Sequence, residues 1–246
     1  MTDTNVPSPS VPDKGPAARL IGVLLSPGET FRAIVARPTW LVAAIVVILL
    51  SGGSQLWFQS TEVGRQATLD ETVRRTEALG FKVTDQMYEQ LRKGIMEPSP
   101  ARMAVSYVTT AVVPLVIWAA IAGLLFLAFS ATGGQAAFKQ VYAVVVHSWM
   151  VLAVGALVVT PMNYLRESAS SATNLAVFLP FLPEGSFFAR LAGMVDLFAV
   201  WWVVVLAIGL AACYRKKARN VAAALFAVYA VIALGFAAFM AMRSAS

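Results

Sequence analysis

The sequence has few of the residues on which most enzyme sites depend. It holds one cysteine, Cys213, and one histidine, His147. A single cysteine excludes an intramolecular disulfide and a cysteine metal cluster, and a single histidine excludes a multi-histidine metal site. The sequence also lacks a P-loop, a paired-histidine zinc helix, a nucleophile elbow and clustered carboxylates. We therefore predict a non-enzymatic protein with no cofactor and no catalytic or metal-binding residues.

Charged residues are also scarce. They make up 13% of the chain, whereas 59% of the residues are hydrophobic and occur in long blocks. This composition excludes a soluble globular protein and predicts an integral membrane protein that contacts the lipid bilayer. The net charge is +6, but the basic residues flank the apolar runs and form no patch with interleaved aromatic residues. They indicate membrane topology and not nucleic-acid binding.

Five apolar segments are long enough to cross the hydrocarbon core of a bilayer, for which a helix needs about 20 residues. The middle segment follows a double glycine and contains His147. A helix satisfies its own backbone hydrogen bonds in lipid, so we predict an all-α bundle of five transmembrane helices. The predicted spans are residues 40–58, 103–129, 141–162, 187–213 and 221–242.

Small residues and one proline in these spans indicate how the helices pack. Residues 51–55, with the sequence Ser-Gly-Gly-Ser-Gln, should face other helices and not lipid, because small residues let helix backbones approach. Pro114 removes a backbone hydrogen bond from the second span and should kink it. Ala119 and Gly123 form a small-xxx-small pair in the same span.

The amino-terminal region should remain outside the bilayer core. Residues 1–16 are rich in proline and serine and have no apolar run, so we expect a disordered cytoplasmic tail ahead of a membrane domain at 17–246. Two short amphipathic helices should follow the tail and lie on the membrane surface; Ser26 would cap the second, which carries Phe31 on its apolar side. A plain linker is the alternative. The first helix would have Arg19 at the edge of an apolar side made by Leu20, Ile21, Leu24 and Leu25.

Residues 59–102 form a long polar stretch in which seven basic residues balance seven acidic ones. We predict a helical outer loop with two surface helices. A capping box at Thr68 and Glu71 would start the first helix, which Gly80 would end, and Thr84 would cap the second. The second helix carries an apolar stripe that could pack on the bundle, contact lipid or bind a partner. Its residues are Met87, Leu91 and Ile95.

A second irregular stretch connects the third and fourth spans at residues 163–186. Its apolar part is too short to cross a bilayer and contains Pro180 and Pro183. We interpret it as a re-entrant or interfacial segment.

The distribution of basic residues predicts the orientation. Short loops that are rich in lysine and arginine remain in the cytoplasm. With residues 59–102 set aside, nine basic residues lie on the amino-terminal side and three, Arg166, Arg190 and Arg243, lie on the other. This difference places the amino terminus in the cytoplasm and Ser246 outside. The nine are Lys14, Arg19, Arg32, Arg37, Lys139, Arg215, Lys216, Lys217 and Arg219.

His147 and Asp196 are the candidate intramembrane polar residues. Ionisable groups inside a membrane are costly and often functional. From the predicted spans, His147 lies about 10 Å from the inner face and Asp196 about 13 Å from the outer face. A direct salt bridge would then require helix tilt or a bound water. The two residues could serve a proton- or solute-coupled pathway, or they could simply hydrogen-bond neighbouring helices.

Two motifs resemble a known family. The first runs from Leu-Ser-Pro-Gly-Glu-Thr-Phe at 25–31 to Arg-Pro-Thr-Trp at 37–40, and the second is Gly133-Gly134 followed by Phe-Lys-Gln-Val at 138–141. With five spans after a cytoplasmic tail, they resemble the YIP family of Ypt/Rab-interacting multi-spanning membrane proteins. Residues 141–214, including Asn-Tyr-Leu-Arg-Glu-Ser at 163–168, resemble its bacterial branch. The resemblance covers nearly the whole chain from Leu20 and implies a multi-pass protein of a bacterial inner membrane.

The resemblance also implies a class of function. Eukaryotic members of the family associate with small GTPases and with one another in vesicle traffic. No GTPase-binding motif can be mapped onto the short tail of this chain, so that role is not carried over to individual residues. The first hypothesis is a non-enzymatic component that organises membranes or binds other membrane proteins or itself. The alternative is a small transporter or lipid-handling protein with Pro114, His147 and Asp196 near its pathway, and an intramembrane enzyme is the weakest reading.

Overall fold

The computed structural model describes residues 15–183 and 186–244, and its regular elements there are all helical. Residues 1–14 of the predicted tail lie outside the described residues, and Pro16 already begins a helix. The all-α prediction is confirmed for the described residues. The α-helices are α1 (Pro16–Leu25), α2 (Pro27–Ala36), α3 (Leu41–Val47), α4 (Gly53–Ser60), α5 (Glu62–Ala78), α6 (Asp85–Met96), α7 (Pro100–Ala131), α8 (Phe138–Ser148), α9 (Met150–Leu165), α10 (Phe187–Met194), α11 (Leu197–Tyr214) and α12 (Ala218–Ser244).

Five helical segments of the described chain are long and apolar enough to cross a membrane, as predicted. The first joins α3 to α4 through the π-helix η1 (Ile48–Gly52), and the third joins α8 to α9. The second is α7, which continues through Pro114 and is not ended by it. The segments are Leu41–Ser60, Pro100–Ala131, Phe138–Leu165, Leu197–Tyr214 and Ala218–Met242.

The fourth span differs from its prediction. It begins at Leu197 and not at residue 187, because the chain leaves helical geometry between α10 and α11. Asp196 therefore lies at the start of the span and not inside it. Hydropathy missed this break because apolar residues continue on both sides of Asp196.

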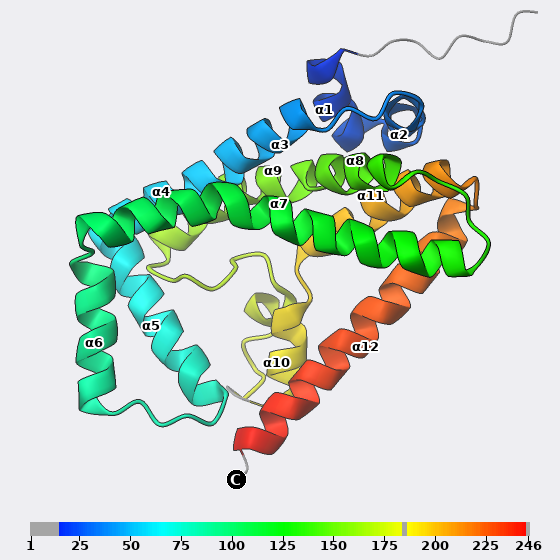
Figure 1. Ribbon diagram of the computed structural model, residues 1–246. Coiled ribbons are helices and arrows are strands. Elements are labelled where there is room, and N and C mark those ends of the chain that lie inside the picture. The colour runs from blue at the N-terminus through cyan, green and yellow to red at the C-terminus, as the bar shows by residue number, and fades with distance from the viewer. Residues whose placement is uncertain (1–14, 184–185, 245–246) are drawn as a thin grey trace, which may run out of the picture.

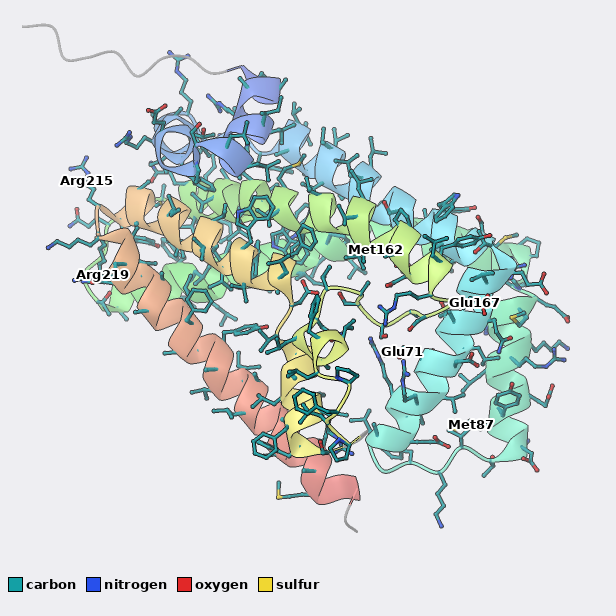
Figure 2. The ribbon with its side chains drawn as sticks, turned by 180° about the vertical axis from the view of Figure 1, so that it is seen from behind. Glu71, Met87, Met162, Glu167, Arg215 and Arg219 are labelled. Atoms are coloured by element: carbon teal, nitrogen blue, oxygen red, sulfur yellow. The ribbon has the colours of Figure 1, made fainter. Side chains whose placement is uncertain are left out.

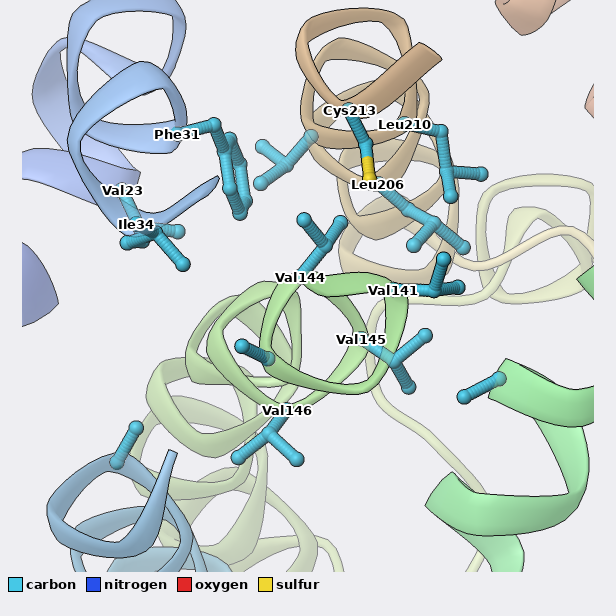
Figure 3. Packing of buried hydrophobic residues seen from close by; sticks show 14 of the residues in the cluster. Val23, Phe31, Ile34, Val141, Val144, Val145, Val146, Leu206, Leu210 and Cys213 are labelled. Carbon is cyan, nitrogen blue, oxygen red and sulfur yellow. The ribbon is translucent and has the colours of Figure 1, made fainter. Parts of the chain in front are cut away.

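The core lies where α2, α8 and α11 meet. Figure 3 shows Phe31 and Ile34 of α2 facing Val144 of α8, while Leu210 lies on the side of α11 away from α2. All four of these side chains are fully buried. Gly209 permits the close approach, since a Cβ there would lie 2.5 Å from Val144 Cγ1 and 3.0 Å from the Phe31 ring.

The two amino-terminal helices pack on the bundle (Figure 1). Their predicted position on the membrane surface stays a prediction. The apolar side of α2 is as predicted, but it faces α8 and α11. On α1, Leu20 is buried, whereas Ile21 and Leu25 are exposed. Helix α2 begins at Pro27, directly after Ser26, but the predicted cap is wrong because the Ser26 side chain makes no capping hydrogen bond. Instead, Thr30 Oγ1 donates to the Ser26 carbonyl at 2.9 Å.

The predicted contact face at residues 51–55 is confirmed at one of its glycines. Gly52 is buried, and a Cβ there would lie 2.5 Å from Thr110 Cγ2 of α7. Gly53 is exposed and has open space at its Cβ position. The first span therefore approaches α7 closely at Gly52.

Helices α5 and α6 form the two predicted helices of the polar stretch. Helix α5 begins at Glu62 under a cap from Thr61, so the predicted start at Thr68 is wrong. The Thr68 hydroxyl donates to the Gly64 carbonyl, and Glu71 pairs with arginines of its own helix. The predicted stop and second cap are confirmed by the positive φ of Gly80 and the Thr84 cap. Figure 2 shows Glu71 and Met87 on this hairpin, away from Arg215.

Candidate functional site

Asp196 lies at the junction of α10 and α11, where it holds the loop after α9. One carboxylate oxygen accepts hydrogen bonds from the amides of Phe198 at 2.8 Å and Ala199 at 3.2 Å, which caps α11. The other oxygen accepts from the hydroxyls of Ser171 at 2.6 Å and Thr173 at 2.7 Å. Both oxygens are therefore occupied by donors from this chain.

The backbone around Asp196 joins the same loop. The amide of Leu175 donates to the Val195 carbonyl at 2.8 Å, and the amide of Leu197 donates to the Thr173 carbonyl at 3.2 Å. The hydroxyl of Tyr229 on α12 donates to the Met194 carbonyl. Hydrogen bonds thus join four elements where the fourth span is interrupted: the 166–183 loop, α10, α11 and α12.

The hydrogen bonds at this junction set the charge state of Asp196. Partial burial acts to raise the pKa of the carboxyl, but the hydroxyls of Ser171 and Thr173 and the amides of Ala199 and Phe198 lower it further than burial raises it. The net pKa lies below the ordinary value. Hydrogen bonds to the charged form have this effect, so Asp196 is a carboxylate at neutral pH.

His147 lies in the buried centre of the third span. Its Nδ1 is 2.8 Å from the carbonyl oxygen of Ala143, one turn earlier in α8. A carbonyl can only accept, so Nδ1 carries the hydrogen. The next residue, Ser148, is fully buried and accepts a hydrogen bond from Trp202 Nε1 of α11 at 3.0 Å.

The structure does not bring His147 and Asp196 together. No hydrogen bond or salt bridge joins them in the described chain, and each is bound to other groups. Trp202, which contacts the residue after His147, lies six residues beyond Asp196 on α11, or about 9 Å along the helix axis. The two residues therefore share no hydrogen-bond partner among the described residues, and their role in a pathway stays a hypothesis.

The two sequence motifs meet at one end of the bundle. Gln140 Nε2 donates to the carbonyl of Val35 at 3.0 Å, which joins the start of α8 to α2. Gly133 has a φ of +77°, and a Cβ at Gly134 would lie 2.7 Å from the ring of Tyr214. That ring stacks on Phe129 at a centroid distance of 4.5 Å. Glycines are thus required here for the turn and for the close approach.

Arg19 is a buried residue that sequence analysis placed only at the edge of a helix. It is 5% exposed, and its Nη1 donates to the Arg37 carbonyl at 3.0 Å and to Thr39 Oγ1 at 2.8 Å. These hydrogen bonds link α1 to residues 37–39, which lead into the first span. Its partners lie 18 and 20 residues away, so no local pattern indicates them.

The short basic loop also belongs to this end. Lys216 Nζ donates to Thr132 Oγ1 at 3.3 Å, which links the α11–α12 loop to the α7–α8 loop. Figure 2 shows Arg215 and Arg219 at this end, with Met162 and Glu167 at the opposite end of the third span. We call the region formed by α1, α2, the α7–α8 loop and the α11–α12 loop the basic end.

Comparison with known families identifies this arrangement. A model of the Yip1 domain matches residues 21–242 of the chain. The chain belongs to the Yip1 family. No curated protein and no solved structure matches it. The match spans all five membrane segments, so this Yip1-domain chain is a multi-pass membrane protein.

In this Yip1-domain protein the motif residues act chiefly in packing. Phe31, Gly134 and Gln140 join separate helices at the basic end. Asp196 and His147 are held by hydrogen bonds within the chain. These contacts assemble the centre of the bundle, whereas α7 and α12 are mostly exposed.

Proposed function

We propose that this protein is a non-enzymatic membrane component that acts by associating with other membrane-spanning chains, including its own copies. The observation that carries the proposal is the uneven burial of its spans. Of an 18-residue apolar stretch in each span, half is buried within the chain in Phe138–Leu165 and Leu197–Tyr214, but only 11% in Pro100–Ala131 and 17% in Ala218–Met242. Two complete spans thus present most of their surface outward (Figure 1).

The outward face of α7 includes the predicted small-residue pair. A Cβ at Gly123 would meet nothing within 4 Å, and Ala119 is exposed. Small residues on an open helix face let a second helix approach closely. The family resemblance, which implies association with other membrane proteins, supports the same conclusion.

Photo-crosslinking tests this proposal. A benzophenone side chain would be placed at Leu124 on α7 or Val231 on α12, which are 69% and 70% exposed, with fully buried Ala122 as the control position. The purified protein would be irradiated in vesicles at low protein density, and the products separated by mass. We expect a crosslinked dimer from at least one exposed position and none from position 122.

Irradiation of the same variants in cells would test association with other proteins. Reproducible protein adducts at the exposed positions are expected there as well. Lipid adducts alone, in both vesicles and cells, would show that lipid covers these faces and would contradict the proposal.

We also propose that the basic end faces the cytoplasm and that the protein resides in a bacterial inner membrane. The support is the gathering of basic residues from three separate segments at this end, which hydrogen bonds at Gln140 and Lys216 hold together. A reporter enzyme that is active only outside the cytoplasm should work after Ser246 and fail in the Arg215 loop. The opposite pattern would reverse the orientation.

The alternative of a transport pathway gains no support from the two polar residues. Both oxygens of Asp196 accept hydrogen bonds from residues within this chain, and His147 Nδ1 bonds its own helix. These are arrangements that stabilise helices and their junctions. We therefore do not extend the proposed function to transport.

A further inference from the structure

A pocket of about 380 Å³ lies at the corner where α4 turns into α5 and α6 turns into α7. Figure 1 shows these four helices meeting at that corner. The first two membrane spans end or begin there, at Ser60 and Pro100. The pocket therefore lies at the boundary between the apolar spans and the charged α5–α6 hairpin.

The pocket has two chemically different sides. Leu56, Ile95 and Met103 give it apolar surface, and the guanidinium groups of Arg65 and Arg102 give it positive charge. None of the described side chains that line it is acidic. Such a pocket fits an amphiphile with an anionic polar group.

Neither arginine forms a salt bridge within the described residues. Other arginines of the hairpin pair with carboxylates: Arg75 lies 2.5 Å from Glu71, and Arg92 lies 3.2 Å from Glu89. Arg65 instead donates through Nη1 to the Ser60 carbonyl at 3.1 Å, and its buried Nε has no partner in the described chain. Arg102 likewise has no carboxylate within salt-bridge distance among the described residues.

The position of Arg102 depends on Gly94. A Cβ at Gly94 would lie 1.8 Å from Arg102 Nη1, so the guanidinium occupies the space that a side chain on α6 would fill. The lack of a side chain at Gly94 thus leaves room on α6 for the guanidinium group of Arg102. Apolar surface continues from the pocket along the same side of α7, where Met103, Tyr107 and Val113 are 41%, 59% and 45% exposed.

We infer that this pocket binds the phosphate of an anionic glycerophospholipid. The phosphate lies between the guanidinium groups of Arg65 and Arg102, which match phosphate geometry and form strong charge-assisted hydrogen bonds. The unpartnered Nε of Arg65 gains an acceptor. The acyl chains follow the exposed apolar side of α7 into the membrane. Inorganic phosphate has no acyl chains and would gain nothing from this surface.

Native mass spectrometry of the full chain tests the inference. The purified protein would be titrated in detergent with phosphatidylglycerol or with phosphatidylcholine, and the Kd of the first bound lipid measured. We expect R65Q and R102Q each to weaken phosphatidylglycerol binding by about tenfold, because each removes a charge-assisted contact. Phosphatidylcholine should bind more weakly to the wild type than phosphatidylglycerol does.

Two matched variants separate this site from a general effect of charge. R74Q makes the same change at an exposed arginine that pairs with Glu71, and it should leave the Kd unchanged. G94A keeps both charges but displaces Arg102, and alanine favours the helix. It should weaken phosphatidylglycerol binding by several-fold, and helix content by circular dichroism would verify that each variant folds.

Any one of four outcomes would overturn the inference. An equal loss in R74Q would show that net charge alone attracts the lipid. Equal Kd values of the wild type for the two lipids would show that the pocket does not select an anionic lipid. A Kd for phosphatidylglycerol that is unchanged in R65Q, R102Q and G94A would show that the lipid does not bind at this pocket. Inorganic phosphate that binds the wild type as tightly as phosphatidylglycerol does would show that the pocket recognises the free anion and not the lipid.

Discussion

Replacing Phe31 with alanine should lower the free energy of unfolding by about 3–5 kcal/mol, the usual cost of deleting a buried aromatic side chain. The ring is fully buried and lies between α2, α8 and α11. The cavity cannot close easily, because Gly209 and Val144 already approach each other closely. Unfolding of the purified protein in micelles by sodium dodecyl sulfate, followed by tryptophan fluorescence, would measure the loss.

An exposed phenylalanine provides the control for this change. Phe181 is 75% exposed, and F181A deletes the same atoms without opening a cavity in the core. Its unfolding curve should stay close to the wild type. Equal losses in F31A and F181A would mean that α2 does not anchor the bundle, and the helices at the basic end would then be peripheral.

The number of spans could be predicted because lipid imposes a simple requirement on the chain. A backbone without water must be helical, and a helix must be long and apolar enough to cross. Residues 141–162 satisfy this condition by composition alone. The prediction was wrong where apolar residues continue outside a span, as between residues 187 and 194, because hydropathy does not register a change of chain direction.

The details of the polar sites depend on partners distant in sequence. Asp196 contacts Ser171 and Thr173, more than 20 residues earlier, and Arg19 contacts Thr39. Sequence patterns report spacing along one helix and cannot show such contacts. One local signal was available: aspartate is a preferred residue at a helix start, and reading Asp196 as a cap would have predicted the break before α11.

The pocket at the α4–α7 corner was also outside the reach of sequence. Arg65 and Arg102 are separated by the whole hairpin, and charge counting treated them as part of a balanced stretch. Folding pairs Arg74, Arg75 and Arg92 with acidic neighbours on their own helices. The basic and acidic residues of 59–102 therefore balance in number, but the pocket itself carries a positive charge.

Replacing Asp196 with alanine should lower the free energy of unfolding by about 2–3 kcal/mol, because it removes both the cap of α11 and the acceptor for two hydroxyls. The same unfolding assay would measure the change. S186A is a matched control. Ser186 caps the adjacent α10 by accepting one hydrogen bond from the Ala189 amide at 3.2 Å. Its loss should be about 1 kcal/mol.

The pH dependence of stability separates the charge of Asp196 from its role as a cap. Its pKa is lower in the folded protein than the ordinary value, so its carboxylate stabilises the fold above about pH 4, and this contribution is lost as the pH falls through the folded pKa. D196N keeps an oxygen that can cap α11 but has no proton to bind in this range. The stability difference between wild type and D196N should therefore be constant near neutral pH and shrink under acid conditions. A difference that persists unchanged in acid would mean that the ionised carboxylate does not hold the junction, and that the four hydrogen bonds act through geometry alone.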